Sequence, residues 1–181
     1  MRKSAQVHKG FTLVELLVVI AIVAILAAVV VLIINPLELT RRGRDAARLT
    51  DLSNLQNAIN VAVQESTGSG AVAVLCKDAG SYPCSGSSHT GTRASDGSGW
   101  VKTDMSAQQS VSVPTLPVDP VNSTAYHYTY CADNDTWEIN TVLESSQQSG
   151  KMSTDGGNEN TRYEVGSNLT IVAASGGACT Y

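Results

Sequence analysis

The sequence predicts an α+β protein. It combines a long N-terminal helix, whose apolar half protrudes and whose amphipathic half packs on a small antiparallel β-sheet, with a disulfide-stabilised head. Three observations predict this class: an unbroken apolar run near the N-terminus, a helical pattern of apolar residues after it, and a Ser-, Thr- and Gly-rich remainder with four cysteines. Of the 181 residues, 43% are hydrophobic and only 15% are charged, a low share for a soluble domain.

The apolar run extends from Leu16 to Ile34 without a polar side chain. It reaches the length of about 18 residues that a helix needs to cross a membrane. A cleaved secretory signal is the weaker interpretation, because Asn35-Pro36 follows the run instead of a small-residue cleavage site. Basic residues before the run, among them Arg2 and Lys3, favour an N-terminus inside the cell.

Glu15 directly precedes this run. A carboxylate in or beside hydrocarbon is costly, so such groups are by default paired and functional. Nothing in the apolar stretch can pair with Glu15, and we expect its partner to come from a new N-terminus or from another chain. The alternative is that the side chain reaches the lipid headgroups from its position near the end of the run.

The segment KGFTLVELLVVIAI, from Lys9 to Ile22, resembles the class III signal of type IV pilins and pseudopilins. The resemblance implies that a prepilin peptidase cuts after Gly10 and N-methylates the new first residue, Phe11. The apolar helix is then retained in the mature chain. It also implies that Glu15 acts in assembly, by engaging the N-terminal amine of a neighbouring subunit.

Pro36 interrupts the helical pattern, which then continues towards Gln64. We expect a kink between residues 33 and 43, because proline removes a helical hydrogen bond and clashes with the preceding turn. Apolar residues recur every three or four positions beyond it and predict one buried stripe: Leu49, Leu52, Leu55, Ile59 and Val63. The expected parts are a leader (1–10), a transmembrane and filament-core helix (11–35), an amphipathic helix (36–66) and a β-rich head (67–181).

Four arginines follow the apolar run: Arg41, Arg42, Arg44 and Arg48. We interpret them as a collar that faces solvent or lipid headgroups. The alternative is that they pair with acidic surfaces on the heads of neighbouring subunits.

The head contains a predicted β-hairpin, in which strands at residues 126–131 and 137–143 flank the turn formers of residues 132–136. A further strand is predicted at residues 169–174. Three tyrosines share one face of the first strand, and we expect them to pack on the helix stripe rather than bind a ligand: Tyr126, Tyr128 and Tyr130. Residues 82–99 are rich in Ser and Gly and predict a surface loop. Residues 114–144 loosely resemble the segment of major pseudopilins in which an Asp-Pro turn precedes a Tyr-bearing strand.

The even number of cysteines in an exported, loop-rich head predicts two disulfides, for which three connectivities are possible. We favour Cys76–Cys84, which closes a local loop, and Cys131–Cys179, which ties a strand to the C-terminus as the closing disulfide does in many pilins. No cysteine pair has the spacing of a structural zinc site.

Acidic loops offer oxygen ligands for calcium at four positions: Asp119, Asp133, Asp135 and Asp155. Their spacing does not fit an EF-hand, so turn formation is the favoured interpretation and calcium the weaker one. No other cofactor is expected.

Composition excludes two classes of function. The net charge of −4 argues against nucleic-acid binding, which relies on clustered positive charge, so no specific nucleic-acid partner is predicted. The three histidines form no recognisable metal or nucleophile motif and no phosphate-binding loop is present, so we predict that the protein is not an enzyme.

The resemblance implies a structural subunit of a type IV pilus-like filament, polymerised through its N-terminal helix. Its implied partners are further copies of itself, the prepilin peptidase, the pilus assembly platform protein with its ATPase motor, and the inner membrane, which the single-pass chain spans before assembly. The filament is expected on the cell surface. Two alternatives stay open: a major pseudopilin of a type II secretion system, and a minor tip adhesin whose head binds a sugar or a surface ligand.

Overall fold

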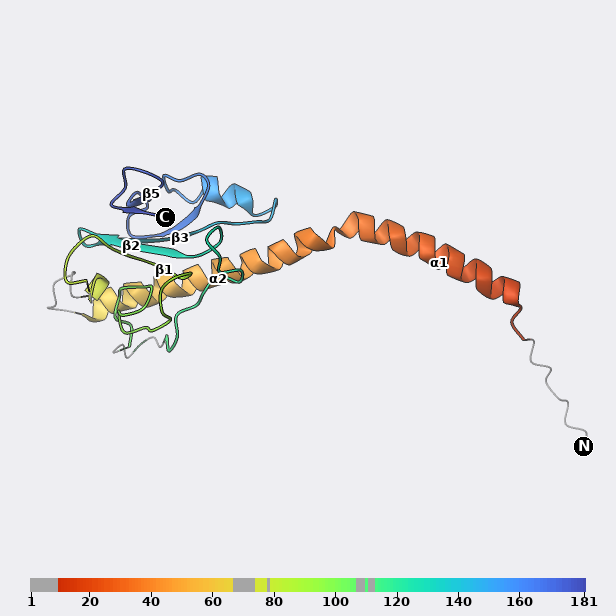
Figure 1. The fold of residues 1–181 in the computed structure, drawn as a ribbon, viewed down its shortest axis with the longest axis horizontal. Helices are drawn as coiled ribbons and strands as arrows, with labels where there is room; N and C mark the ends of the chain where they lie inside the picture. The colour runs from red at the N-terminus through yellow and green to blue at the C-terminus, as the bar shows by residue number, and fades with distance from the viewer. Residues whose placement is uncertain (1–9, 67–73, 78, 107–109, 111–112) are drawn as a thin grey trace, which may run out of the picture. The chain divides into compact units, whose positions relative to one another are not determined.

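The computed structural model describes residues 10–66, 74–77, 79–106, 110 and 113–181 (Figure 1). The chain divides into two compact units, Met1–Leu39 and Thr40–Tyr181. Of the predicted leader, only Gly10 lies among the described residues, and the start of the predicted head, residues 67–73, also lies outside them.

The first unit contains helix α1, Leu13–Ile34. It ends because Asn35 adopts a left-handed conformation, with φ at 45°, and Pro36 cannot donate a backbone hydrogen bond. Helix α2, Pro36–Glu65, begins at once, with proline at its first position, where a missing N–H costs nothing. The interruption therefore falls at Asn35, inside the range of 33–43 expected from the sequence.

In the second unit, α2 buries one face. Leu52, Leu55 and Ile59 are at most 1% exposed, as the predicted stripe requires. The stripe is wrong at its far end, because Val63 is 43% exposed and Ala62 is buried instead. Ala62 and Val63 lie three and four residues after Ile59, so the helical spacing fits either side chain. The rotation of α2 about its own axis relative to the sheet buries Ala62 and leaves Val63 exposed.

The head contains a four-stranded antiparallel sheet in the order β1-β2-β3-β4. In chain order the strands are β1 (Cys84–Ser87), β2 (Thr129–Asp133), β3 (Thr136–Thr141) and β4 (Tyr163–Gly166). The predicted hairpin is confirmed, but its first strand starts later, its second strand ends earlier, and its turn is shorter than the predicted 132–136. Asp133 pairs with Thr136, and the two residues between them both have positive φ, as a tight two-residue turn requires. The α+β class predicted from the sequence is confirmed as well.

One face of the sheet packs on α2 (Figure 1). Tyr128 and Tyr130 are fully buried there, and the hydroxyl of Tyr128 donates a 2.9 Å hydrogen bond to Asp51 of α2. The expectation that the tyrosine row packs on the helix is therefore correct for these two residues, whereas Tyr126 is only half-buried.

The predicted surface loop at residues 82–99 is partly wrong. Its residues Cys84–Ser87 form the edge strand β1, and the region packs around Trp100, which is fully buried. A Cβ on Gly86 would lie 2.1 Å from the carbonyl oxygen of Trp100. The small residues of this segment are thus needed for close packing, although the same composition is typical of an exposed loop.

The C-terminal segment covers the other face of the sheet. Strands β5 (Val172–Ala173) and β6 (Cys179–Thr180) form a short parallel pair, so the strand predicted at residues 169–174 is present but shorter. A short 3-10 helix, η1 (Ser149–Ser153), precedes β4. The disulfides join Cys76 to Cys84 and Cys131 to Cys179, which is the pairing favoured from the sequence.

Candidate functional site

The predicted processing site lies just before α1. Phe11 is 87% exposed, and nothing lies within 4 Å of the position that a Cβ on Gly10 would occupy. Thr12 is extended, with φ at −80° and ψ at 150°, and helical structure starts at Leu13. A peptidase can therefore reach the bond between Gly10 and Phe11 without unfolding the helix.

Glu15 and Thr12 form a capping box at the start of α1. The backbone N–H and the hydroxyl of Thr12 both donate to Glu15 Oε2, at 2.9 and 2.6 Å, and Thr12 Oγ1 accepts from the backbone N–H of Glu15 at 3.3 Å. This arrangement satisfies donors that a helix start otherwise leaves unpaired. Thr12 precedes the apolar stretch and supplies hydrogen bonds but no positive charge. An ionic partner for Glu15 from a new N-terminus or another chain stays a prediction.

The capped carboxylate still has room for a second partner. An ionised carboxyl group can accept about four hydrogen bonds, and the contacts with Thr12 use only one of its two oxygens. An ammonium group brought to this helix end meets a negative charge that is already held in place. The geometry is thus compatible with the role in assembly that the resemblance implies for Glu15.

The surface of α1 is apolar on every side. One segment of the described chain, Leu13–Val31, is long and apolar enough to cross a membrane, with 19 residues and a mean hydropathy of 3.2, and none of it is buried. A helix that is hydrophobic all round is stable only inside lipid or against other apolar elements. The first unit therefore needs a membrane or further helices around it.

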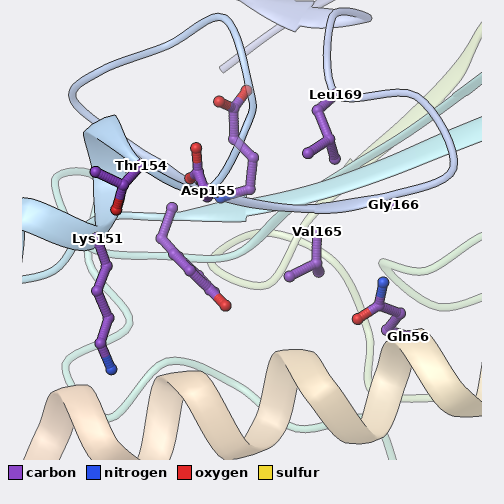
Figure 2. Close-up of a pocket in the computed structure, with 9 residues that line it drawn as sticks. Gln56, Lys151, Thr154, Asp155, Val165, Gly166 and Leu169 are labelled. Atoms are coloured by element: carbon purple, nitrogen blue, oxygen red, sulfur yellow. Dashed lines mark hydrogen bonds between the residues drawn. The ribbon is translucent and has the colours of Figure 1, made fainter.

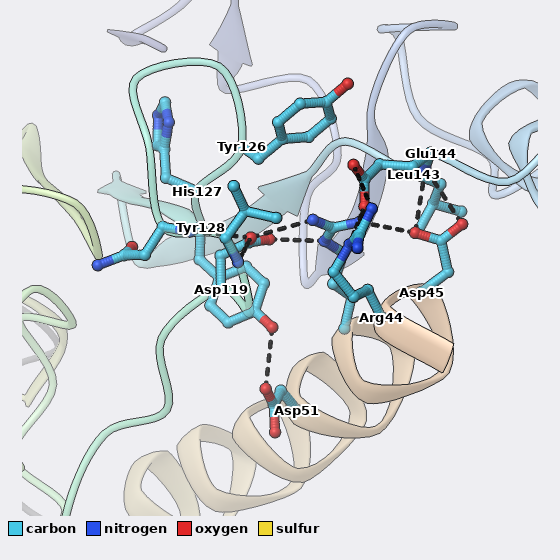
Figure 3. A network of polar contacts seen from close by, with 12 residues as sticks. Arg44, Asp45, Asp51, Asp119, Tyr126, His127, Tyr128, Leu143 and Glu144 are labelled. Atoms are coloured by element: carbon cyan, nitrogen blue, oxygen red, sulfur yellow. Dashed lines mark hydrogen bonds and ion pairs between the residues drawn. The ribbon is translucent and has the colours of Figure 1, made fainter. Parts of the chain in front are cut away.

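In the head, acidic groups gather around a buried arginine of α2. The guanidinium of Arg48 binds Asp119 through two hydrogen bonds, Nε–Oδ2 at 2.6 Å and Nη2–Oδ1 at 3.0 Å. Its Nη1 also donates to Asp45 at 2.7 Å and to Glu144 at 2.9 Å. Figure 3 shows these three acids converging from α2, from the segment before β2 and from the segment after β3.

This cluster corrects the interpretation of Arg48 as part of a collar. Arg48 is completely buried within its own head, and Arg44 binds Glu144 there at 2.6 Å. Arg48 therefore cannot face lipid headgroups or the head of a neighbour, whereas 27% of the Arg44 side chain is still exposed. For Arg41, Arg42 and Arg44 the collar stays a prediction. The sequence signal that could have indicated the burial of Arg48 is its position, three residues after Asp45 and four before Leu52, on the buried face of α2.

The backbone completes the cluster. Asp45 accepts hydrogen bonds from the N–H groups of Glu144 and Ser145, and Asp119 accepts from those of Val121 and Asn122. Burial alone raises the pKa of Asp119, but the hydrogen bonds and the charge of Arg48 outweigh it and hold that pKa below its ordinary value. The cluster therefore fastens α2 to two loops of the head in ionised form.

The four calcium candidates are not brought together. Both oxygens of Asp119 are engaged by Arg48, Asp133 and Asp135 belong to the hairpin turn, and Asp155 accepts from the backbone N–H groups of Gly157 and Glu164. Among the residues that the structure describes, no group of three or more His, Cys, Asp or Glu side chains could hold a metal ion. A calcium site stays a prediction, and the described part of the chain gives it no location.

A pocket of about 430 Å³ lies between α2 and the β4 side of the head (Figure 2). Gln56 borders it on α2, and Lys151, Thr154, Asp155 and Val165 border it on the head side. These side chains carry charges of both signs, and none of them indicates a particular ligand. The pocket therefore does not by itself favour the adhesin alternative.

Comparison with known proteins adds one finding at the N-terminus. Residues 6–31 match the family model of the prokaryotic N-terminal methylation motif. This motif is the hallmark of type IV pilins and pseudopilins, and it covers the predicted cleavage site, Glu15 and most of α1. The fold and the site thus define a pilin-like protein, and the chain carries the signal of the type IV pilin and pseudopilin family. No curated protein and no solved structure matches the chain.

Proposed function

We propose that this chain is the structural subunit of a type IV pilus-like filament. Prepilin peptidase cuts after Gly10, the amine of Phe11 is methylated, and copies polymerise through α1. The observation that carries the proposal is a helix of membrane-spanning length that is apolar on every side. Its third residue, Glu15, has a carboxylate that Thr12 holds in place by hydrogen bonds.

The apolar surface of α1 fits lipid before assembly and the helices of other copies after assembly. In the membrane the helix is surrounded by lipid, and no hydrophobic force drives one such helix against another. Polar groups supply the missing specificity there, because an unsatisfied charge in hydrocarbon is costly. Glu15 is the only ionisable residue of α1, so it is the group that can select the N-terminal amine of another copy.

The head supports export across the membrane. Its four cysteines form two disulfides, and such bonds persist in oxidising compartments outside the cytoplasm. The basic leader favours retention of the N-terminus inside the cell. The chain is thus proposed to span the inner membrane once before assembly and to reach the cell surface in the filament.

The proposal is tested by co-expressing the chain with a prepilin peptidase and a pilus assembly machinery. Mass spectrometry of the mature protein should find methylated Phe11 as the first residue, and electron microscopy of sheared material should show filaments in which this chain is the main component. A Gly10→Val variant should keep its leader and form no filaments. A mature chain that starts at any other residue would contradict the proposal.

The same material separates the alternatives. A major pseudopilin should depend on secretion genes and should form no long surface fibres. A tip adhesin should be a minor component of fibres built from another chain. The proposed partners are tested by inactivating the ATPase motor. Processing at Gly10 should continue, whereas filaments should be lost.

A further inference from the structure

Two buried glutamates lie together on the face of the sheet that the C-terminal segment covers. Glu138 of β3 pairs with Gly166, and Glu164 of β4 pairs with Asn140. Side chains alternate along a strand, so this register puts Glu138 and Glu164 on the same face as diagonal neighbours. Glu138 is 0% exposed and Glu164 is 2% exposed.

One oxygen of each carboxyl group is well paired. Glu138 Oε2 accepts from the backbone N–H groups of Ile171 and Val172, both at 3.1 Å, and thereby anchors the C-terminal segment to the sheet. Glu164 Oε2 accepts from the backbone N–H of Glu159 at 3.1 Å. Gly157 makes room for this oxygen, since a Cβ there would lie 1.8 Å from it.

The other oxygen of each group has no donor. Glu138 Oε1 and Glu164 Oε1 are both buried without a hydrogen-bond partner among the described residues. Each carboxyl group also contributes to the shift in the other's pKa, as expected for diagonal neighbours on one face of the sheet. An ionised carboxylate only accepts hydrogen bonds, whereas a protonated one also donates. A single proton held between the two groups satisfies both oxygens, and its absence leaves two buried like charges side by side.

We propose that Glu138 and Glu164 share one proton, and that this proton holds the C-terminal segment, residues 171–181, on the sheet. The segment is a latch that closes when the pair is protonated and loosens when it ionises. Loss of the proton leaves two negatively charged carboxylates next to each other. One of them, Glu138, accepts the hydrogen bonds from Ile171 and Val172.

The surrounding charges favour the shared proton. The segment before β4 contributes Asp155 and Glu159, whose negative charges raise the pKa of Glu164 in addition to the larger effect of burial. Arg162 contributes the nearby positive charge, but its guanidinium lies 3.6 Å from the ring centre of Tyr181 and donates to Asn140. Lys151 binds Gln148. On this face β2 contributes Cys131, which is in a disulfide, and the acidic residue Asp133 at the end of the strand.

Burial, together with the neighbouring Glu164, raises the pKa of Glu138 to about 8. An exposed glutamate titrates at about 4.3. Between about pH 4.3 and pH 8, the closed latch binds one more proton than the open latch. Closure is therefore most favourable below about pH 4 and becomes less favourable as the pH rises towards about 8. The equilibrium constant for opening should rise about tenfold per pH unit in this interval.

The test is hydrogen exchange of the full-length protein in detergent micelles, followed by mass spectrometry of the peptide that contains residues 171–181. After division by the intrinsic exchange rate, protection of this peptide should fall about tenfold per pH unit between about pH 5 and pH 7 and should level off above about pH 8. Glu138→Gln keeps an acceptor for Ile171 and Val172 and supplies a permanent donor to Glu164, so its protection should not depend on pH in this range. Asp96→Asn, which neutralises an acid bonded to Ser98 outside the four-stranded sheet and the C-terminal segment, should retain the pH dependence of the parent chain.

Glu164→Gln is the second variant, because it also replaces the shared proton by a permanent donor. Infrared spectra of the parent chain at pH 7 should contain the carbonyl band of a buried protonated carboxyl group, and the band should be missing from both variants. Equal pH dependence in the parent chain and in the variants would overturn the proposal, and so would the absence of this band from the parent chain. The infrared result decides the matter even if a variant fails to fold.

Discussion

Arg48 and Asp119 form a two-point ion pair, at 2.6 and 3.0 Å, in which both side chains are inaccessible to solvent. The residues are far apart in sequence, and the pair joins α2 to the segment that precedes β2. A fully buried guanidinium is tolerated only when its donors are matched by acceptors. Asp45 and Glu144 supply the remaining acceptors, so the four residues act as one unit.

Replacing Arg48 should destabilise the head strongly. Arg48→Met keeps an apolar stem but leaves Asp119 and Asp45 buried beside each other without a cation, and a loss of about 3–5 kcal/mol in unfolding free energy is expected. Chemical denaturation followed by tryptophan fluorescence measures this loss, because both tryptophans lie in the head and none lies in α1. Arg44→Met is the matched control. It removes a more exposed arginine that binds only Glu144 within this cluster, so its effect should be much smaller. Equal losses of unfolding free energy in the two variants would show that the burial of Arg48 does not determine its contribution to stability.

The same ion pair predicts a loss of stability in acid. Arg48 lowers the pKa of Asp119 in the folded head, so the contribution of the pair is complete above the ordinary pKa of an aspartate, near 3.9, and is lost as the pH falls through the lowered value. Asp119→Asn removes this titration. The difference in unfolding free energy between the parent chain and Asp119→Asn should be constant from about pH 5 to pH 7 and should shrink towards pH 2. A difference that does not change with pH would contradict the ionised pair.

The N-terminal half of the fold was predictable because its signals are local. The apolar run, Pro36 and the class III signal each specify structure within a few residues. The hairpin of β2 and β3 was predictable for the same reason, since its turn formers lie between two alternating strands. Arg48 was not, because its acceptors come from residues 71 and 96 positions further along the chain. The packing around Trp100 was missed because a Ser- and Gly-rich segment is typical of an exposed loop.

Gly86 tests that packing directly. The Cβ of Gly86→Ala would meet the carbonyl oxygen of Trp100 at 2.1 Å, and a backbone atom cannot give way as the end of a flexible side chain does. The variant should lose about 1–3 kcal/mol of unfolding free energy, as expected for overpacking of a core. Gly150→Ala is the control, because nothing lies within 4 Å of its Cβ position, and it should change the stability by no more than about 0.5 kcal/mol. Similar behaviour of the two variants in chemical denaturation would contradict a packed role for β1.

Glu15 has two roles that a single substitution would confuse, because its side chain both caps α1 and carries the charge proposed to bind an amine. Glu15→Val removes both roles. Glu15→Gln removes only the charge, since glutamine also serves at this position of a capping box. Neither change should alter the denaturation curve of the head, whose tryptophans report on the second unit alone.

Both Glu15 variants should be processed at Gly10 and should accumulate in the membrane, with little or no filament in the sheared fraction. The physical reason is that an N-terminal ammonium group in an apolar setting has no oppositely charged partner on either variant. Immunoblots of sheared and membrane fractions, with the N-terminus checked by mass spectrometry, measure the outcome. Normal filament yield from Glu15→Gln together with loss of filaments from Glu15→Val would assign Glu15 to helix capping alone. Normal filament yield from both variants would show that Glu15 has no role in assembly.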